Sequence, residues 1–219
     1  MTFLSLDVEY NSNSGVVYQI GAVKMGKDGK YCFFNSIIPE LLQECCVEKV
    51  THRFCYALKN SIVGSFPIVM QSLLDFSRDV DFVLTWGCDD GVVLAREVNR
   101  KSLSLEKEML VPLFDKFANL QSVFSRIYPK TGTKLGDVIK NYGLSFVGFP
   151  HDALSDSINT YLIAEKIKIR EEACLASLYG VGLVDYLGIP VDEKWIYEEE
   201  FSSILDFCSE NQLKKLGIV

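Results

Sequence analysis

The stretch Phe3-Leu4-Ser5-Leu6-Asp7-Val8-Glu9-Tyr10 lies near the start of the chain and predicts a buried strand that ends in two carboxylates. Because side chains alternate between the faces of a strand, Asp7 and Glu9 are expected to point to the same side, one pleat apart. Two carboxylates this close repel each other unless a cation lies between them. Mg²⁺ and Mn²⁺ favour such oxygen ligands. A strand that runs into a polar loop also carries acids, so this stretch alone fits a metal site and a plain strand end equally.

The composition is that of an ordinary soluble globular protein. The chain has 219 residues, 48% hydrophobic and 23% charged, enough for one sizeable core or one domain with a small appendage. The net charge of −7 argues against a protein that holds nucleic acid on a broad basic surface. We expect no membrane span, since no apolar run approaches ~20 residues, and no secretory signal. The 7 cysteines include no C-x-x-C pair, so we expect free thiols and a cytoplasmic location.

The hydrophobic periodicity predicts three antiparallel strands followed by alternating helices and strands. Residues 2–8, 16–25 and 31–38 are the first strands, and Asp28-Gly29 supplies the hairpin turn between the last two. The later expected elements are short helices within 40–60, strands at 81–86 and 108–114, and helices near 66–74, 90–99, 117–127, 135–142 and from 152 to beyond 168. This order indicates the α/β class, with a mixed sheet flanked by helices.

The chain changes character after residue 172. Residues 173–187 are apolar and contain several glycines, and residues 192–208 have the pattern of an amphipathic helix. We therefore expect a main domain over residues 1–170 and a helical C-terminal extension over residues 171–219. The apolar face of that helix either packs back on the main domain or meets a protein partner.

One later stretch, Leu84-Thr85-Trp86-Gly87-Cys88-Asp89-Asp90, places two acids after a strand end. Both acids stand at the start of a predicted helix. An Asp there can serve as a helix cap as well as a ligand, so the stretch leaves both interpretations open.

The second later stretch is His151-Asp152-Ala153-Leu154-Ser155-Asp156-Ser157, at the start of the long predicted helix. Asp152 is the natural N-cap, and His151 lies just before the helix. Asp156 lies beside the stripe of residues that we expect to be buried, so it can reach an interior site; that stripe comprises Leu154, Ile158, Tyr161 and Leu162. The other histidine, His52, has no acidic residues grouped around it and is expected to be structural or at the surface.

The three motifs, in this order, resemble those of the DnaQ-like 3′–5′ exonucleases of the DEDDh type, which have the ribonuclease H-like fold. The motifs are Asp-x-Glu at residues 7–9, an Asp after Trp86-Gly87, and His-x-Ala-x-x-Asp at residues 151–156. The resemblance covers about residues 1–168 and includes Gln19-Ile20-Gly21-Ala22-Val23, which is similar to the family's second strand. The Trp-Gly-x-x-Asp form is most similar to the branch that holds small-RNA and histone-mRNA 3′ exonucleases and KapD-like proteins.

The resemblance implies that Asp7, Glu9, Asp90 and Asp156 bind two Mg²⁺ or Mn²⁺ ions and that His151 is the general base. If the loop after Gly87 is shifted by one residue, Asp89 takes the place of Asp90. The implied reaction is phosphodiester hydrolysis at the 3′ end of single-stranded RNA or DNA, with release of nucleoside 5′-monophosphates.

The resemblance also implies substrate contacts at Val8, Tyr10 and Trp86. Tyr10 stands where the family often has a small residue, Gln19 where a Glu is common, and Ser157 where an Ala is frequent. Two alternatives remain at this point. The chain can be an exonuclease-fold subunit that docks to a polymerase or another nucleic-acid-processing complex through 172–219, or a structural α/β domain whose acids are caps and surface residues.

Overall fold

The computed structural model describes residues 2–11, 13–39, 61–87, 89–101, 107–128 and 133–168, so the predictions for 40–60 and 171–219 lie outside it. Within these residues six strands form one sheet in the order β4-β3-β2-β1-β5-β6. The strands are β1 (Phe3–Tyr10), β2 (Val17–Met25), β3 (Tyr31–Ile37), β4 (Ile62–Val63), β5 (Phe82–Thr85) and β6 (Phe117–Asn119). β1, β2 and β3 are antiparallel neighbours, whereas β5 runs parallel to β1 and β6 parallel to β5. The predicted mixed sheet is confirmed.

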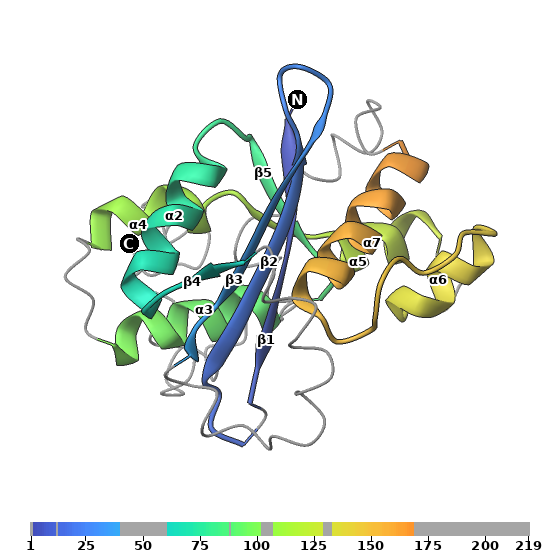
Figure 1. The fold of residues 1–219 in the computed structure, drawn as a ribbon. Helices are drawn as coiled ribbons and strands as arrows, with labels where there is room; N and C mark the ends of the chain where they lie inside the picture. Colours follow the sequence, from blue (N-terminus) through green and yellow to red (C-terminus); the bar gives the residue numbers. More distant parts are fainter. Residues whose placement is uncertain are drawn as a thin grey trace, which may run out of the picture.

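Helices cover both faces of this sheet (Figure 1). On one face lie α2 (Phe66–Ser77), α3 (Asp89–Arg100) and α4 (Lys107–Phe114); on the other lie α5 (Leu120–Ile127), α6 (Leu135–Asn141) and α7 (Ala153–Lys166). Two buried apolar clusters follow the same division. Leu4, Leu6 and Val8 pack with the α2, α3 and α4 side, whereas Phe3 packs with the α5, α6 and α7 side.

The alternation along β1 directs its polar residues toward α7. The Ser5 hydroxyl donates a hydrogen bond of 2.6 Å to the carbonyl oxygen of Ser157 on α7. Asp7 and Glu9 follow at the same period of two, so they lie on the same face of the sheet as Ser5. The strand that the sequence predicts therefore carries its carboxylates on one side.

α7 approaches the sheet closely because β2 has a glycine beneath it. Gly21 is paired with Asp7 across the strands. A Cβ at position 21 would collide with the backbone of Ala153 and Leu154 at the start of α7. This close approach brings the first turn of α7 next to the carboxylates of β1.

The buried face of α7 differs from the predicted stripe. Tyr161 is buried, but Leu154, Ile158 and Leu162 are only half-buried. Small and polar side chains face the interior instead, and they include Ala153, Ser155, Ser157, Asn159, Thr160 and Ala164. The first turn of α7 packs tightly over Gly21, which favours small side chains in that turn and explains the error there. The helix also ends at Lys166, short of the predicted end beyond 168.

The prediction of a strand at 108–114 is wrong, because these residues belong to the helix α4. Leu110, Leu113 and Phe114 recur at helical spacing and are buried in the first apolar cluster. Pro112 lies beyond the first turn of the helix and removes a single backbone donor, and burial of this face outweighs that loss. In the predicted helix 117–127, the first residues form the strand β6 instead.

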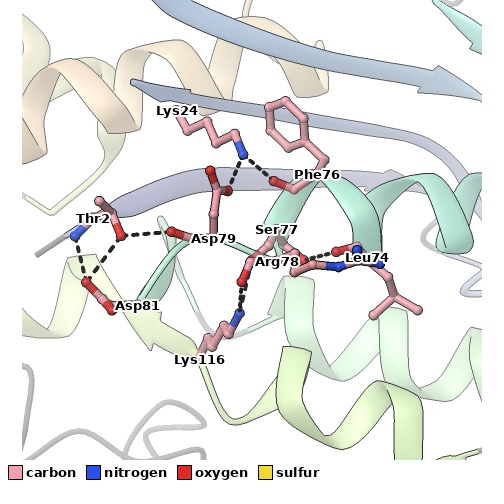
Figure 2. Close-up of polar contacts among 9 residues, drawn as sticks. All are labelled: Thr2, Lys24, Leu74, Phe76, Ser77, Arg78, Asp79, Asp81 and Lys116. Carbon is pink, nitrogen blue, oxygen red and sulfur yellow. Dashed lines mark hydrogen bonds and ion pairs between the residues drawn. The ribbon is translucent and has the colours of Figure 1, made fainter. Parts of the chain in front are cut away.

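Polar contacts fix the turn that joins α2 to β5 (Figure 2). Lys24 of β2 pairs with Asp79 and donates a hydrogen bond of 2.6 Å to the Phe76 carbonyl. The backbone nitrogen of Thr2 donates to the Asp81 carboxylate at 2.7 Å. These bonds hold the start of β5 against β1 and β2, so that β1 and β5 run side by side.

None of the helices in the described part of the chain is long and apolar enough to span a membrane.

Candidate metal centre

A cleft of about 550 Å³ opens where the carboxyl ends of β1 and β5 diverge. Asp7, His151 and Asp156 line it together with Trp86 and Lys134. The remaining lining residues come from α6 and the loop before α7: Leu135, Gly136, Asp137, Phe146 and Pro150. The edge at the carboxyl ends of parallel strands is the usual place for a binding crevice in α/β sheets.

Asp7 and Glu9 carry strongly perturbed carboxyl groups. Burial, followed by the charge of Asp90, raises the pKa of Asp7 well above its ordinary value. Burial, followed by the charge of Asp156, raises the pKa of Glu9 to about 8. The Tyr18 hydroxyl, which donates to Glu9 Oε2 at 3.4 Å, opposes this rise. The raised values are the expected result of burying several carboxylates close together.

Asp90 reaches the end of β1 from the first turn of α3. β1 is paired with β5 only at Phe3, Leu4 and Ser5, so the Val8 backbone nitrogen lies beyond this pairing. That nitrogen donates to Asp90 Oδ1 at 2.9 Å, and Asp90 is 7% exposed. The structure thus places Asp90 beside Asp7 and Glu9, while the side chain of Asp89 lies outside the described part.

His151 and Asp156 are joined across the start of α7. The His151 backbone nitrogen donates to Asp156 Oδ2 at 2.9 Å, and His151 has a φ of 61°. A positive φ outside glycine is uncommon and is a feature of constrained functional loops. The exposed imidazole of His151 therefore lies directly beside the carboxylate of Asp156.

The first turn of α7 is fixed by Asp152 and Gln19. Asp152 Oδ2 accepts a hydrogen bond from the Ser155 backbone nitrogen at 3.0 Å, which confirms the predicted N-cap. Gln19 Nε2 donates to Asp152 Oδ1 at 2.9 Å, and Gln19 Oε1 accepts from the Ala153 backbone nitrogen at 3.3 Å. The neutral amide of Gln19 can both donate and accept here, which a glutamate cannot.

The side chains that converge fit a divalent metal. One ligand atom each from Glu9, His151 and Asp156 lies within 4.8 Å of the others. Asp7 lines the same cleft, and the charges of Asp7 and Asp90 interact with each other. Clustered carboxylate oxygens are a suitable donor set for Mg²⁺ or Mn²⁺.

The three residues expected to contact substrate occupy different positions. Trp86 lines the cleft, and its indole Nε1 donates to the Thr133 carbonyl at 2.8 Å. Val8 is 4% exposed and packs in the first apolar cluster, and Tyr10 is half-buried against that cluster. Of the three, Trp86 is the one whose side chain is among the described residues that line the cleft.

Sequence reasoning did not identify Lys134, Gly21 or Tyr18 as parts of this region. Lys134 precedes a short helix, and its spacing from the motifs carries no signal. Gly21 and Tyr18 lie on β2, and their relevance depends on the register that pairs Asp7 with Gly21 and Glu9 with Gln19.

No protein-family profile matches the chain, and no curated protein is similar to it in sequence. Solved structures are similar in fold. A full-length 3′-exonuclease is 17% identical with a TM-score of 0.60, and the match covers 79% of this chain and 61% of that one. A 3′-exonuclease that recognises the 3′ end of a histone mRNA stem-loop is also 17% identical with a TM-score of 0.60, over 79% of this chain and 83% of that one. Pop2p of S. pombe, in its Mg²⁺- and Mn²⁺-bound form, is 17% identical with a TM-score of 0.51. The match covers 77% of this chain and 83% of that one.

These likenesses establish the fold. The mixed sheet of this chain, with helices on both faces, matches the fold of these two 3′-exonuclease structures. The chain spans about three fifths of the full-length 3′-exonuclease that it matches.

Proposed function

We propose that the protein is a metal-dependent 3′–5′ exonuclease of the DEDDh type that acts on single-stranded nucleic acid. The observation that carries the proposal is the convergence of Asp7, Glu9, Asp90, His151 and Asp156, separated by up to 149 positions, at one end of the sheet. A structural α/β domain would have no reason to gather buried carboxylates at a cost in electrostatic repulsion.

Asp7, Glu9, Asp90 and Asp156 would hold two Mg²⁺ or Mn²⁺ ions. When bound, the ions would lower the pKa of a coordinated water and neutralise negative charge at the scissile phosphate. A neutral imidazole is the most common general base near neutral pH, and His151 would take the proton of the attacking water. The water oxygen forms a bond to phosphorus, the bond from phosphorus to the 3′ oxygen breaks, and a nucleoside 5′-monophosphate leaves.

A gel assay tests this function. Single-stranded RNA and DNA labelled at the 5′ end are incubated with Mg²⁺, Mn²⁺ or EDTA. We expect a ladder of shortening labelled products with either metal and intact substrate in EDTA. Release of a labelled mononucleotide at the outset would instead indicate the opposite polarity.

His151→Ala should abolish the ladder, and His52→Ala, at the other histidine of the chain, is the matched control that should keep it. Absence of a ladder on RNA and DNA in both metals would refute the nuclease activity. That result would favour the alternative function, a subunit that docks to another nucleic-acid-processing protein.

A further inference from the structure

Lys134 is the one lysine or arginine among the described residues that line the cleft. It stands immediately before α6 and is exposed. The other charged residues of the cleft wall are Asp7, Asp137, His151 and Asp156. A single ammonium group therefore faces a predominantly acidic wall.

The backbone next to Lys134 is held in place from two sides. The Thr133 carbonyl accepts a hydrogen bond of 2.8 Å from Trp86 Nε1 and another of 2.8 Å from Gln121 Nε2. Leu135, on the other side of Lys134, packs with the second apolar cluster. The stem of Lys134 thus starts from a fixed point at the mouth of the cleft.

The Lys134 ammonium forms no ion pair with the acids of the cleft wall in the described part of the chain, including Asp137 one turn further along α6. The acids that would bind metal lie on β1, α3 and α7, whereas Lys134 approaches from α6. The cation and the metal ligands therefore form separate parts of the same cleft.

We propose that Lys134 binds a phosphate of the substrate strand other than the one being cleaved, an inference that rests on the proposed function. The scissile phosphate would be neutralised by metal at the carboxylates. Its upstream neighbour enters a protein with a net charge of −7 and needs a cation of its own. Lys134 supplies that cation at a fixed distance from the cleavage site, and so favours strands over single nucleotides.

The test compares Lys134→Ala and Lys134→Arg with Lys140→Ala, an equal charge change at an exposed position on the same helix that does not line the cleft. Two substrates are used: a single-stranded oligonucleotide and the p-nitrophenyl ester of thymidine 5′-monophosphate, which contains one phosphodiester and no upstream phosphate. Fluorescence anisotropy of the labelled oligonucleotide, in a His151→Ala background with Mg²⁺, measures affinity without turnover.

For Lys134→Ala we expect KM and Kd for the oligonucleotide to rise roughly fivefold to tenfold, with kcat unchanged. The slope of log affinity against log salt should fall by about 0.7, the value for one phosphate contact on a single strand. Ester hydrolysis should be unchanged, and Lys134→Arg should keep most of the oligonucleotide affinity.

Three results would overturn the inference. Equal loss on oligonucleotide and ester would place Lys134 at the scissile phosphate. An equal oligonucleotide KM for the variants Lys134→Ala and Lys140→Ala would show that the effect comes from net charge and not from the position of Lys134. A wild-type protein inactive on both substrates would remove the proposed function and this inference with it, whereas the first two results leave the nuclease activity standing.

Discussion

Replacement of Gly21 by alanine tests the packing that brings α7 to the carboxylates of β1. The added Cβ would lie closer than 3.0 Å to backbone atoms of Ala153 and Leu154. Backbone atoms cannot turn aside as the end of a side chain can, so α7 has to move as a unit. Overpacking of a core typically costs 1–3 kcal/mol, and we expect about 3 kcal/mol of the free energy of unfolding to be lost here. For a chain of this size, that loss lowers Tm by about 6–12 °C.

Urea denaturation followed by circular dichroism measures this loss. Gly136→Ala is the control for stability, because a Cβ there meets nothing within 4 Å and alanine is the better helix former; we expect a gain of about 0.5 kcal/mol. Since α7 carries Asp156, Gly21→Ala should also weaken stabilisation by Mn²⁺. A Gly21→Ala protein within 0.5 kcal/mol of the wild type, with an unchanged response to Mn²⁺, would refute the close-packing argument.

Further predictions concern the carboxylates and the start of α7. Mn²⁺ should raise the Tm of the wild type, and Asp7→Ala should remove this shift; an equal shift in the variant would argue against a metal site at Asp7. Burial raises the pKa of Glu9 from 4.5 to about 8, so between these values the folded protein keeps a proton that the unfolded chain has released. The free energy of unfolding of the metal-free protein should therefore fall as pH rises from about 5 to 8, and Glu9→Gln should flatten this slope. Asp152→Ala removes the acceptor for the Ser155 backbone nitrogen and should cost about 1 kcal/mol in urea denaturation; no measurable loss would show that the cap is dispensable.

The sequence was sufficient for features that depend on local periodicity. The alternation in β1 predicts that Asp7 and Glu9 share a face, and the structure directs that face to α7. The N-cap at Asp152 was also predicted, because capping depends on residues three positions apart. The family resemblance supplied the order of the acidic motifs, which places Asp90 and Asp156 with Asp7.

Features that depend on contacts between distant segments could not be predicted. The small buried face of α7 follows from its contact with Gly21, which is 132 positions away from Ala153. The helix α4 was missed because Pro112 disfavours a helix. The helix is stabilised by burial of Leu110 and Leu113 in a core whose other residues come from distant elements. Lys134 follows Thr133, whose carbonyl accepts hydrogen bonds from Trp86 and Gln121, and both of these residues are distant in the sequence.

The docking of α7 on β1 and β2 has a consequence for the order of folding. β1 and the α7 residue Asp156 lie far apart in the sequence, so their contact closes a long loop. In the metal-free protein this closure also brings the carboxylates of Glu9 and Asp156 together, which lowers the free energy needed to open α7 locally. We therefore expect divalent cations to slow amide hydrogen exchange in α7, because they would compensate the charge of the carboxylates.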